Sequence, residues 1–156
     1  MAGAYRIRAA QLADVPELAE LEPLCFSDPW SAAGFREMLA APYIMGLIAE
    51  GKSDSIAGYL VARVIENEGE ILNIAVNPGS RRKGIGALLL DSALAELIVR
   101  GVAAIFLEVR VSNQAAINLY LGKGFRPLGQ RHGYYRRPVE DALVLRWEAS
   151  GSVPRQ

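Results

Sequence analysis

The segment 76–87 constrains this chain more than any other part of it. It follows an apolar run over residues 71–76 and leads into an amphipathic stretch that begins at Leu88. Between the two lie a proline, three consecutive cations and a pair of nearby glycines, namely Pro78, Arg81, Arg82, Lys83, Gly84 and Gly86. A proline ends a central strand, and a capped amphipathic stretch begins a helix. The segment therefore predicts a strand, a basic loop and a helix in direct succession, in a fold where helices pack on a sheet.

The loop has the chemistry of a phosphate site. Free backbone N–H groups at a helix start carry the positive end of the helix dipole, and glycines let a diphosphate approach the backbone closely. The three cations add charge around it. Taken alone, the same residues also fit a turn at Pro78-Gly79 followed by a solvated basic loop. Two other phosphate motifs are excluded, because Lys83 precedes the glycines and the third glycine of a dinucleotide fingerprint is missing.

Composition limits the class of protein. The chain has 156 residues, half of them apolar, and a formal net charge of zero, which argues against disorder and against a general nucleic-acid binder. One cysteine and one histidine leave neither an intramolecular disulfide nor a zinc cluster. No apolar stretch has signal or membrane-spanning length. We therefore expect a cytoplasmic protein without metal, nucleic-acid or membrane partners, with one domain over residues 1–148 and a flexible tail over 149–156.

Periodicity and turn signals predict a mixed sheet with helices on its faces. Helical spacing of Leu12, Val15, Leu18, Leu21 and Leu24 indicates the first helix. In the longest helix, six apolar residues are expected to face inward, namely Ile85, Leu88, Leu89, Ala93, Leu97 and Ile98. The expected strands are 5–9, 43–50, 56–65, 70–76, 103–111, 125–132 and 142–147, and the expected helices are 12–26, 31–39, 84–100 and 114–121.

This element order, with the loop Arg81-x-x-Gly84-x-Gly86, resembles the GNAT superfamily of acetyl-CoA-dependent N-acetyltransferases. Further segments resemble its RimI branch, which acetylates the N-terminal alanine of a small-subunit ribosomal protein; they are 26–31, 73–76, 107–120, 124–125, 134–135 and 140–142. The resemblance covers nearly the whole chain. It implies an α/β (α+β) GNAT fold, in which a mixed, mostly antiparallel sheet with splayed central strands is flanked by helices.

The resemblance also implies where acetyl-CoA binds. The pyrophosphate would lie on the amides of residues 82–87, and the pantetheine would run along the strand 74–76, where an N–H near Val76 can polarise the thioester oxygen. Asn113 either caps a helix or also lies near the pantetheine. The implied cofactor-binding residues are Ile74, Ala75, Val76, Arg81, Arg82, Lys83, Gly84, Ile85, Gly86, Ala87, Asn113 and Tyr120.

Two residues are candidates for proton transfer. Glu108 interrupts an apolar run over 104–109, and a carboxylate in a central strand is costly unless it is solvated, paired or functional. On the pattern alone it could be solvated or paired with Arg110; the resemblance matches it to the family's general base. Tyr120 could be a packed core residue, but it matches the family's general acid, which protonates the coenzyme A thiolate.

Other residues are candidates for the acceptor site. Tyr134 would line the amine site beside Glu108, and Trp30 would shape a peptide groove or anchor two helices on the sheet. Cys25 is a poor candidate for an acetyl-carrying nucleophile, because nothing basic accompanies it in the sequence. The link 136–139 is shorter than in many relatives of the RimI branch.

These features predict an acetyltransferase that acts on the N-terminal alanine of a ribosomal protein. An α-amine titrates near 7.7–8.0 and a lysine near 10.4, so the α-amine needs roughly 3–4 kcal/mol less to become neutral. The same chemistry on a lysine, a polyamine or a small metabolite is the alternative. A non-catalytic acetyl-CoA-binding module is a further one, and the presence of Glu108 and Tyr120 argues against it.

Overall fold

The computed structural model describes residues 5–149, so most of the segment expected to be a flexible tail lies outside the described residues. It contains seven strands, four helices and three short 3-10 turns. The strands are β1 (Arg6–Ala9), β2 (Ile44–Glu50), β3 (Ile56–Ile65), β4 (Glu68–Val76), β5 (Ala104–Arg110), β6 (Arg126–Arg136) and β7 (Val139–Glu148). The helices are α1 (Val15–Cys25), α2 (Ala32–Ala40), α3 (Ile85–Val99) and α4 (Gln114–Gly122). All the predicted elements are therefore present, in the predicted order.

The last two strands are longer than predicted. The sequence pattern placed their ends at His132 and Ala142, whereas the strands continue toward each other until Arg136 pairs with Val139. The segment 132–142 is therefore the turn end of the β6–β7 hairpin instead of a loop. The polar character of these residues hid the strand, since both sides of this hairpin are largely exposed.

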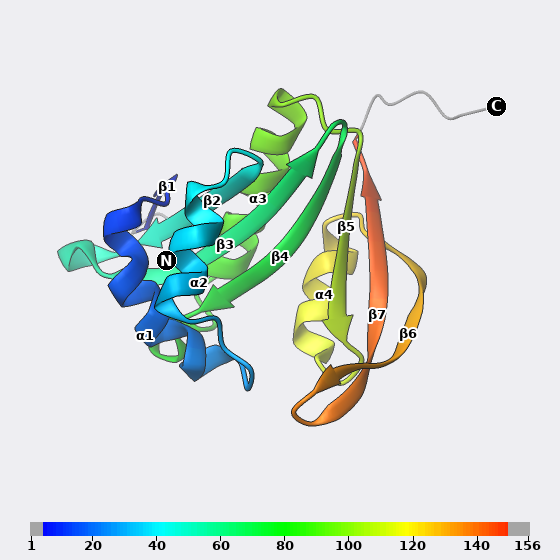
Figure 1. Ribbon diagram of the computed structural model, residues 1–156. Coiled ribbons are helices and arrows are strands. Elements are labelled where there is room, and N and C mark those ends of the chain that lie inside the picture. The colour runs from blue at the N-terminus through cyan, green and yellow to red at the C-terminus, as the bar shows by residue number, and fades with distance from the viewer. Residues whose placement is uncertain (1–4, 150–156) are drawn as a thin grey trace.

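The seven strands form one sheet in the order β1-β2-β3-β4-β5-β7-β6. All neighbours are antiparallel except β4 and β5, which are parallel and pair only from Glu68 opposite Ala104 to Ile71 opposite Leu107. Beyond that point the two strands diverge, and the sheet opens like a V in Figure 1. The predicted mixed sheet with splayed central strands is confirmed.

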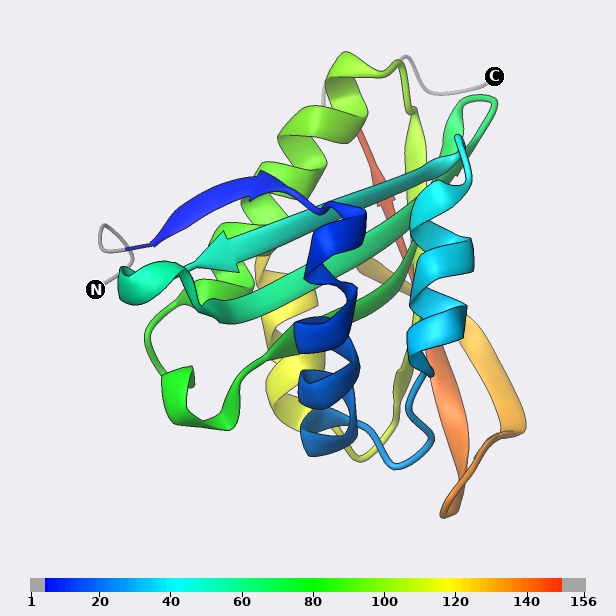
Figure 2. The same ribbon diagram turned by 60° about the vertical axis from the view of Figure 1, so that its left-hand side comes forward.

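Helices cover both faces of the sheet, with α1 and α2 on one face and α3 and α4 on the other (Figure 2). The first pair packs on a cluster that includes Phe35, Ile48 and Tyr59. The second pair packs on a larger cluster that includes Leu89 and Ile105. No helix in the described part of the chain is long and apolar enough to span a membrane.

Helical spacing predicted the buried faces only in part. Leu12, predicted to start the first helix, lies in an exposed 3-10 turn before α1. In α1, Leu24 is exposed because steps of three residues drift around a helix of 3.6 residues per turn, and Glu22 takes an inward position instead. In α3 the buried arc includes Leu90 and Leu94, and Ile98 is exposed. The helix is apolar on more than one side, so spacing alone could not select the buried side.

A β-bulge in β4 decides which residues face each helix pair. Ala62 pairs with Ile71 and Val61 with Asn73, so Leu72 has no opposite residue on β3. After this extra residue, the alternation of side chains is reversed. Ile74 consequently packs toward α3 and α4, on the same side as Ile71, while Asn73 turns toward α1.

Candidate active site

The splayed strands open a groove of about 870 Å³ between β4 and β5. The segment 25–28, Trp30, β4, β5, α4 and the β6–β7 hairpin contribute to its walls. It brings together six side chains that matter below, namely Glu22, Trp30, Asn73, Glu108, Tyr120 and Tyr134. Since β4 has no strand partner on this side after Ile71, its backbone is an open edge to which an extended chain could add.

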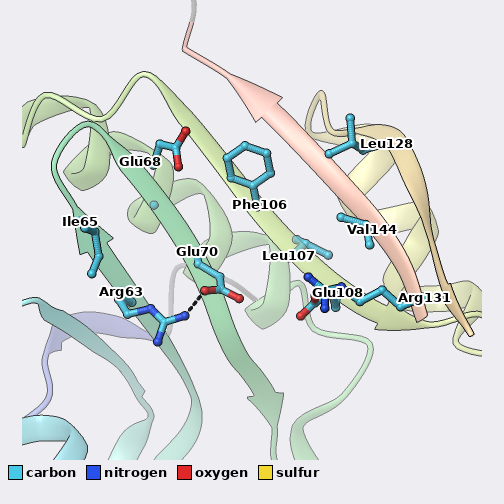
Figure 3. Close-up of a pocket in the computed structure, with 11 residues that line it drawn as sticks. Arg63, Ile65, Glu68, Glu70, Phe106, Leu107, Glu108, Leu128, Arg131 and Val144 are labelled. Atoms are coloured by element: carbon cyan, nitrogen blue, oxygen red, sulfur yellow. Dashed lines mark hydrogen bonds and ion pairs between the residues drawn. The ribbon is translucent and has the colours of Figure 1, made fainter. Parts of the chain in front are cut away.

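Glu108 stands one residue beyond the last residue of β5 that pairs with β4. Its carboxylate accepts a hydrogen bond from the Tyr134 hydroxyl to Oε1 at 2.9 Å. Its other oxygen, Oε2, forms an ion pair with Arg131 Nε at 2.8 Å. Figure 3 shows the Arg131 side chain reaching from β6 toward Glu108. The alternative pairing with Arg110 is wrong, because Arg110 pairs with Glu140 at 3.1 Å.

Tyr134 is half-exposed, and partial burial together with its bond to Glu108 raises the pKa of its hydroxyl. Its neighbour Tyr135 packs edge-on against it, with ring centroids 5.0 Å apart, and lies under the Arg110 guanidinium. Burial raises the pKa of Tyr135 to about 12. The pair forms the hairpin side of the groove, with Tyr134 as the residue that touches Glu108.

Tyr120 is both a core residue and a groove residue. Its ring packs against Phe125 with centroids 5.7 Å apart, and only 4% of the residue is exposed. It nevertheless contributes to the groove wall. Burial raises the pKa of its hydroxyl well above the ordinary value, so the phenol stays protonated over the physiological range.

The loop before α3 leaves its cations and helix start exposed. Gly84 immediately precedes α3 with φ +77°, and nothing lies within 4 Å of the position that a Cβ would take. The first bond of the helix runs from Leu88 N–H to Gly84 C=O, so the amides just before Leu88 are free of helical acceptors. Arg82 and Lys83 are exposed beside them, whereas Arg81 turns back and its Nε lies 3.4 Å from the Val76 carbonyl oxygen.

Asn113 caps α4. Its side-chain oxygen accepts from the Ala116 N–H at 3.2 Å, and the residue also lines the groove. The capping role is therefore confirmed.

Glu22 is a residue of the site that sequence reasoning missed. It is 1% exposed, and its carboxylate accepts hydrogen bonds from the Tyr59 hydroxyl, from Asn73 Nδ2 and from the Trp30 backbone N–H. It thus ties the α1–α2 loop, through Trp30, to β4 just after the bulge. Burial raises the pKa of Glu22. An acidic residue four positions after Leu18, on an otherwise apolar face, was the signal for it.

Trp30 lies on that same wall of the groove. Its ring packs edge-on against Phe35, with centroids 5.3 Å apart. It therefore anchors the loop to the core of the α1–α2 face while it also lines the groove.

Cys25 has a basic neighbour that its sequence context did not indicate. Arg81 Nη2 lies 3.9 Å from the sulfur. Burial nevertheless raises the pKa of the Cys25 thiol, which disfavours the thiolate that a nucleophile needs. Among residues 5–149, no group of three or more His, Cys, Asp or Glu side chains could hold a metal ion.

The chain is similar to known proteins over most of its length. The profile of the acetyltransferase (GNAT) family matches residues 15–125. The chain is 35% identical, over 142 residues, to the [ribosomal protein bS18]-alanine N-acetyltransferase of Escherichia coli K12, with 89% of this chain and 94% of that protein covered. It is 37% identical, over 145 residues, to the N-alpha-acetyltransferase RimI of Mycobacterium tuberculosis, with 90% of each covered. The crystal structure of the E. coli ribosomal-protein-S18-alanine N-acetyltransferase superposes with a TM-score of 0.88 at 30% identity, over 97% of this chain and 98% of that one.

Proposed function

The chain belongs to the acetyltransferase (GNAT) family, and on that premise we propose that it transfers the acetyl group of acetyl-CoA to the α-amine of a protein N-terminal alanine. The proposed acceptor is ribosomal protein bS18, the substrate named for relatives at about this level of identity. A ribosomal acceptor would place its action in the cytoplasm. The observation that carries the proposal is the Glu108 carboxylate, held by Tyr134 where the sheet opens.

The groove and the loop before α3 fit acetyl-CoA. The open space at Gly84, the free amides at the start of α3 and the exposed charges of Arg82 and Lys83 suit a diphosphate. The unpaired edge of β4 over residues 74–76 suits the amide-bearing pantetheine arm, and Asn113 and Tyr120 lie along the same groove. Acetyl-CoA supplies a thioester, from which an amine can take the acetyl group by direct attack.

In this proposal Glu108 is the general base. In neutral water the α-amine of a peptide is in equilibrium with its ammonium form. Glu108 accepts the proton that the nitrogen loses as it attacks the acetyl group, directly or through one water. Tyr134 holds Oε1 of the carboxylate and Arg131 holds Oε2, so both oxygens are fixed in direction while each keeps a lone pair.

Tyr120 is the proposed general acid. Because burial keeps its hydroxyl protonated, the phenol is available to donate its proton to the departing sulfur. A backbone N–H of β4 near Val76 would polarise the carbonyl oxygen as negative charge develops on it. Trp30 and Tyr134 would flank the entering peptide from opposite walls of the groove.

The test measures free thiol released from acetyl-CoA with a hexapeptide that carries the N-terminus of bS18, beginning with alanine. A matched peptide with a blocked α-amine and one free lysine is the control. We expect turnover with the free α-amine, and a large loss in Glu108→Gln and in Tyr120→Phe. Turnover only with the blocked lysine peptide would replace the proposed acceptor by lysine. Acetyl-CoA binding without turnover of any amine, polyamines included, would favour a binding module.

A further inference from the structure

A second hollow, of about 430 Å³, lies beside the groove on the sheet face opposite α3 and α4. Glu108 lines both spaces, and Arg131 reaches over it from β6 (Figure 3). The Arg131 side chain is 60% exposed, whereas the Glu108 side chain is 15% exposed. The candidate base is therefore covered from the solvent side by a cation that the proposed reaction does not use.

Regular pairing of Arg131 with Ala142 places this cation on the face of the sheet that holds Glu108, and a bulge in β6 follows directly after it. Arg131 pairs with Ala142 and Tyr135 with Glu140, so three residues of β6 stand opposite the single residue Asp141. The Asp141 carboxylate holds the bulge, because it accepts from Gly133 N–H at 2.8 Å and contacts His132 Nδ1 at 3.1 Å. Gly133 takes φ +59°, a conformation that favours glycine.

The bulge brings two side chains of β6 to one carboxylate. In a regular strand, residues three positions apart point to opposite faces. Here Arg131 and Tyr134 both contact Glu108, and the Arg131 guanidinium lies 5.4 Å from the centre of the Tyr134 ring. The strand irregularity, held by the Asp141 carboxylate, therefore brings Tyr134 to the carboxylate that Arg131 already contacts.

We propose that Arg131 determines which amines the site accepts, favouring an α-amine over a lysine side chain. The inference rests on the proposed function and assigns its selectivity to one residue. Arg131 already neutralises Glu108, so an entering ammonium gains little attraction there and meets a like charge. A neutral amine meets no such repulsion, and the carboxylate keeps lone pairs with which to accept its proton.

The two amines differ greatly in how often they are neutral. At pH 7.5 roughly a third of α-amines are uncharged, against about one lysine in a thousand. A site that rejects cations therefore selects the α-amine. The acidic residues that share the hollow with Glu108 do not restore the attraction for a cation. Glu70 of β4 is paired with Arg63 of β3 (Figure 3), and Glu68 is the one further acidic residue among those lining the hollow.

The experiment compares kcat/KM for two peptides, one with a free alanine α-amine and no lysine, the other blocked at its α-amine with one lysine. In Arg131→Gln we expect the ratio of α-amine to lysine turnover to fall by roughly fivefold or more, chiefly through a lower KM for the lysine peptide. Arg131→Lys, which keeps the charge, should retain the wild-type ratio. Arg126→Gln is the matched control, because it removes a cation from the far end of β6.

An unchanged ratio in Arg131→Gln, with acetyl-CoA binding retained, would overturn the inference and leave the proposed function intact. A fallen ratio in Arg131→Lys would also overturn it, whatever Arg131→Gln does, since the charge would then not be the cause. Absence of wild-type turnover with the alanine peptide would instead remove the proposed function, and this inference with it.

Discussion

Replacing Glu22 by alanine should destabilise the protein by about 2–4 kcal/mol. The Glu22 carboxylate is 1% exposed and satisfies three donors, the Tyr59 hydroxyl, the Asn73 amide and the Trp30 backbone N–H. A buried donor left without its acceptor costs roughly 1–3 kcal/mol. Asn73 and Trp30 are only half-buried, so water can satisfy part of their loss, and removing the carboxylate also relieves its own desolvation. Tyr59, in contrast, is only 1% exposed.

Equilibrium unfolding in urea, followed by far-ultraviolet circular dichroism, measures this change. Glu20→Ala is the matched control, since Glu20 lies on the same helix but is exposed, and it should change the free energy of unfolding by less than about 0.5 kcal/mol. A loss below about 1 kcal/mol in Glu22→Ala would refute the reasoning, because it would mean that the three donors find other partners at little cost.

A double-mutant cycle with Tyr59→Phe separates the hydrogen bond from the packing. In the wild type, Tyr59→Phe removes a donor from Glu22 and should cost about 1–2 kcal/mol. In the Glu22→Ala background the same change deletes a hydroxyl that has lost its acceptor, so it should be neutral or stabilising. Equal costs in both backgrounds would show that the two residues are not coupled.

Three further changes follow from single contacts. Tyr120→Phe should lower kcat roughly 100-fold to 10,000-fold while the calorimetric affinity for acetyl-CoA is kept; a loss below about tenfold would reject the proposed acid. Gly58→Ala would place a Cβ 2.7 Å from the Ala75 carbonyl oxygen of β4, so it should lower the free energy of unfolding by about 2–3 kcal/mol and lower the thermal midpoint accordingly. An unchanged midpoint would mean that β4 shifts away from the added methyl group at little cost. The hydrogen bond from Arg8 lowers the pKa of Asp14 below its ordinary value of 3.8, so the ionised carboxylate stabilises the folded state. The loss of unfolding free energy in Asp14→Asn should therefore be complete at pH 7 and vanish as the pH falls through the lowered pKa. A loss that does not change with pH would contradict this.

The sequence predicted the strands, helices and caps, which depend on residues close together in the chain. Each strand and helix was recovered because apolar spacing, caps and turn residues act over a few positions, as in the cap that Asn113 forms on α4. The loop at Gly84 could also be predicted from the sequence, because a residue in the left-handed conformation just before a helix favours glycine.

What the sequence did not reveal depends on contacts between distant segments. The bulges at Leu72 and opposite Asp141 leave no periodic signal, yet the first reverses which side chains of β4 face the groove and the second brings Tyr134 to Glu108. Pairing of Glu108 with Arg110, two residues away, was one alternative left open by the pattern, whereas the structure brings Arg131 from another strand. Spacing along β5 could not find Arg131, because the register of β6 on β7 determines its position.

The position of Glu108 also explains how a central strand can hold a carboxylate. A carboxylate between two paired strands would lose its hydration without full compensation, at a cost of several kcal/mol. Leu107 is the last residue of β5 that pairs with β4, and Glu108 follows it where the strands separate. The same divergence exposes the edge of β4 on which acetyl-CoA is proposed to lie. One geometric event, the end of the parallel pairing, thus makes room for the cofactor and opens the proposed base to the groove, so closing the splay should abolish both functions together.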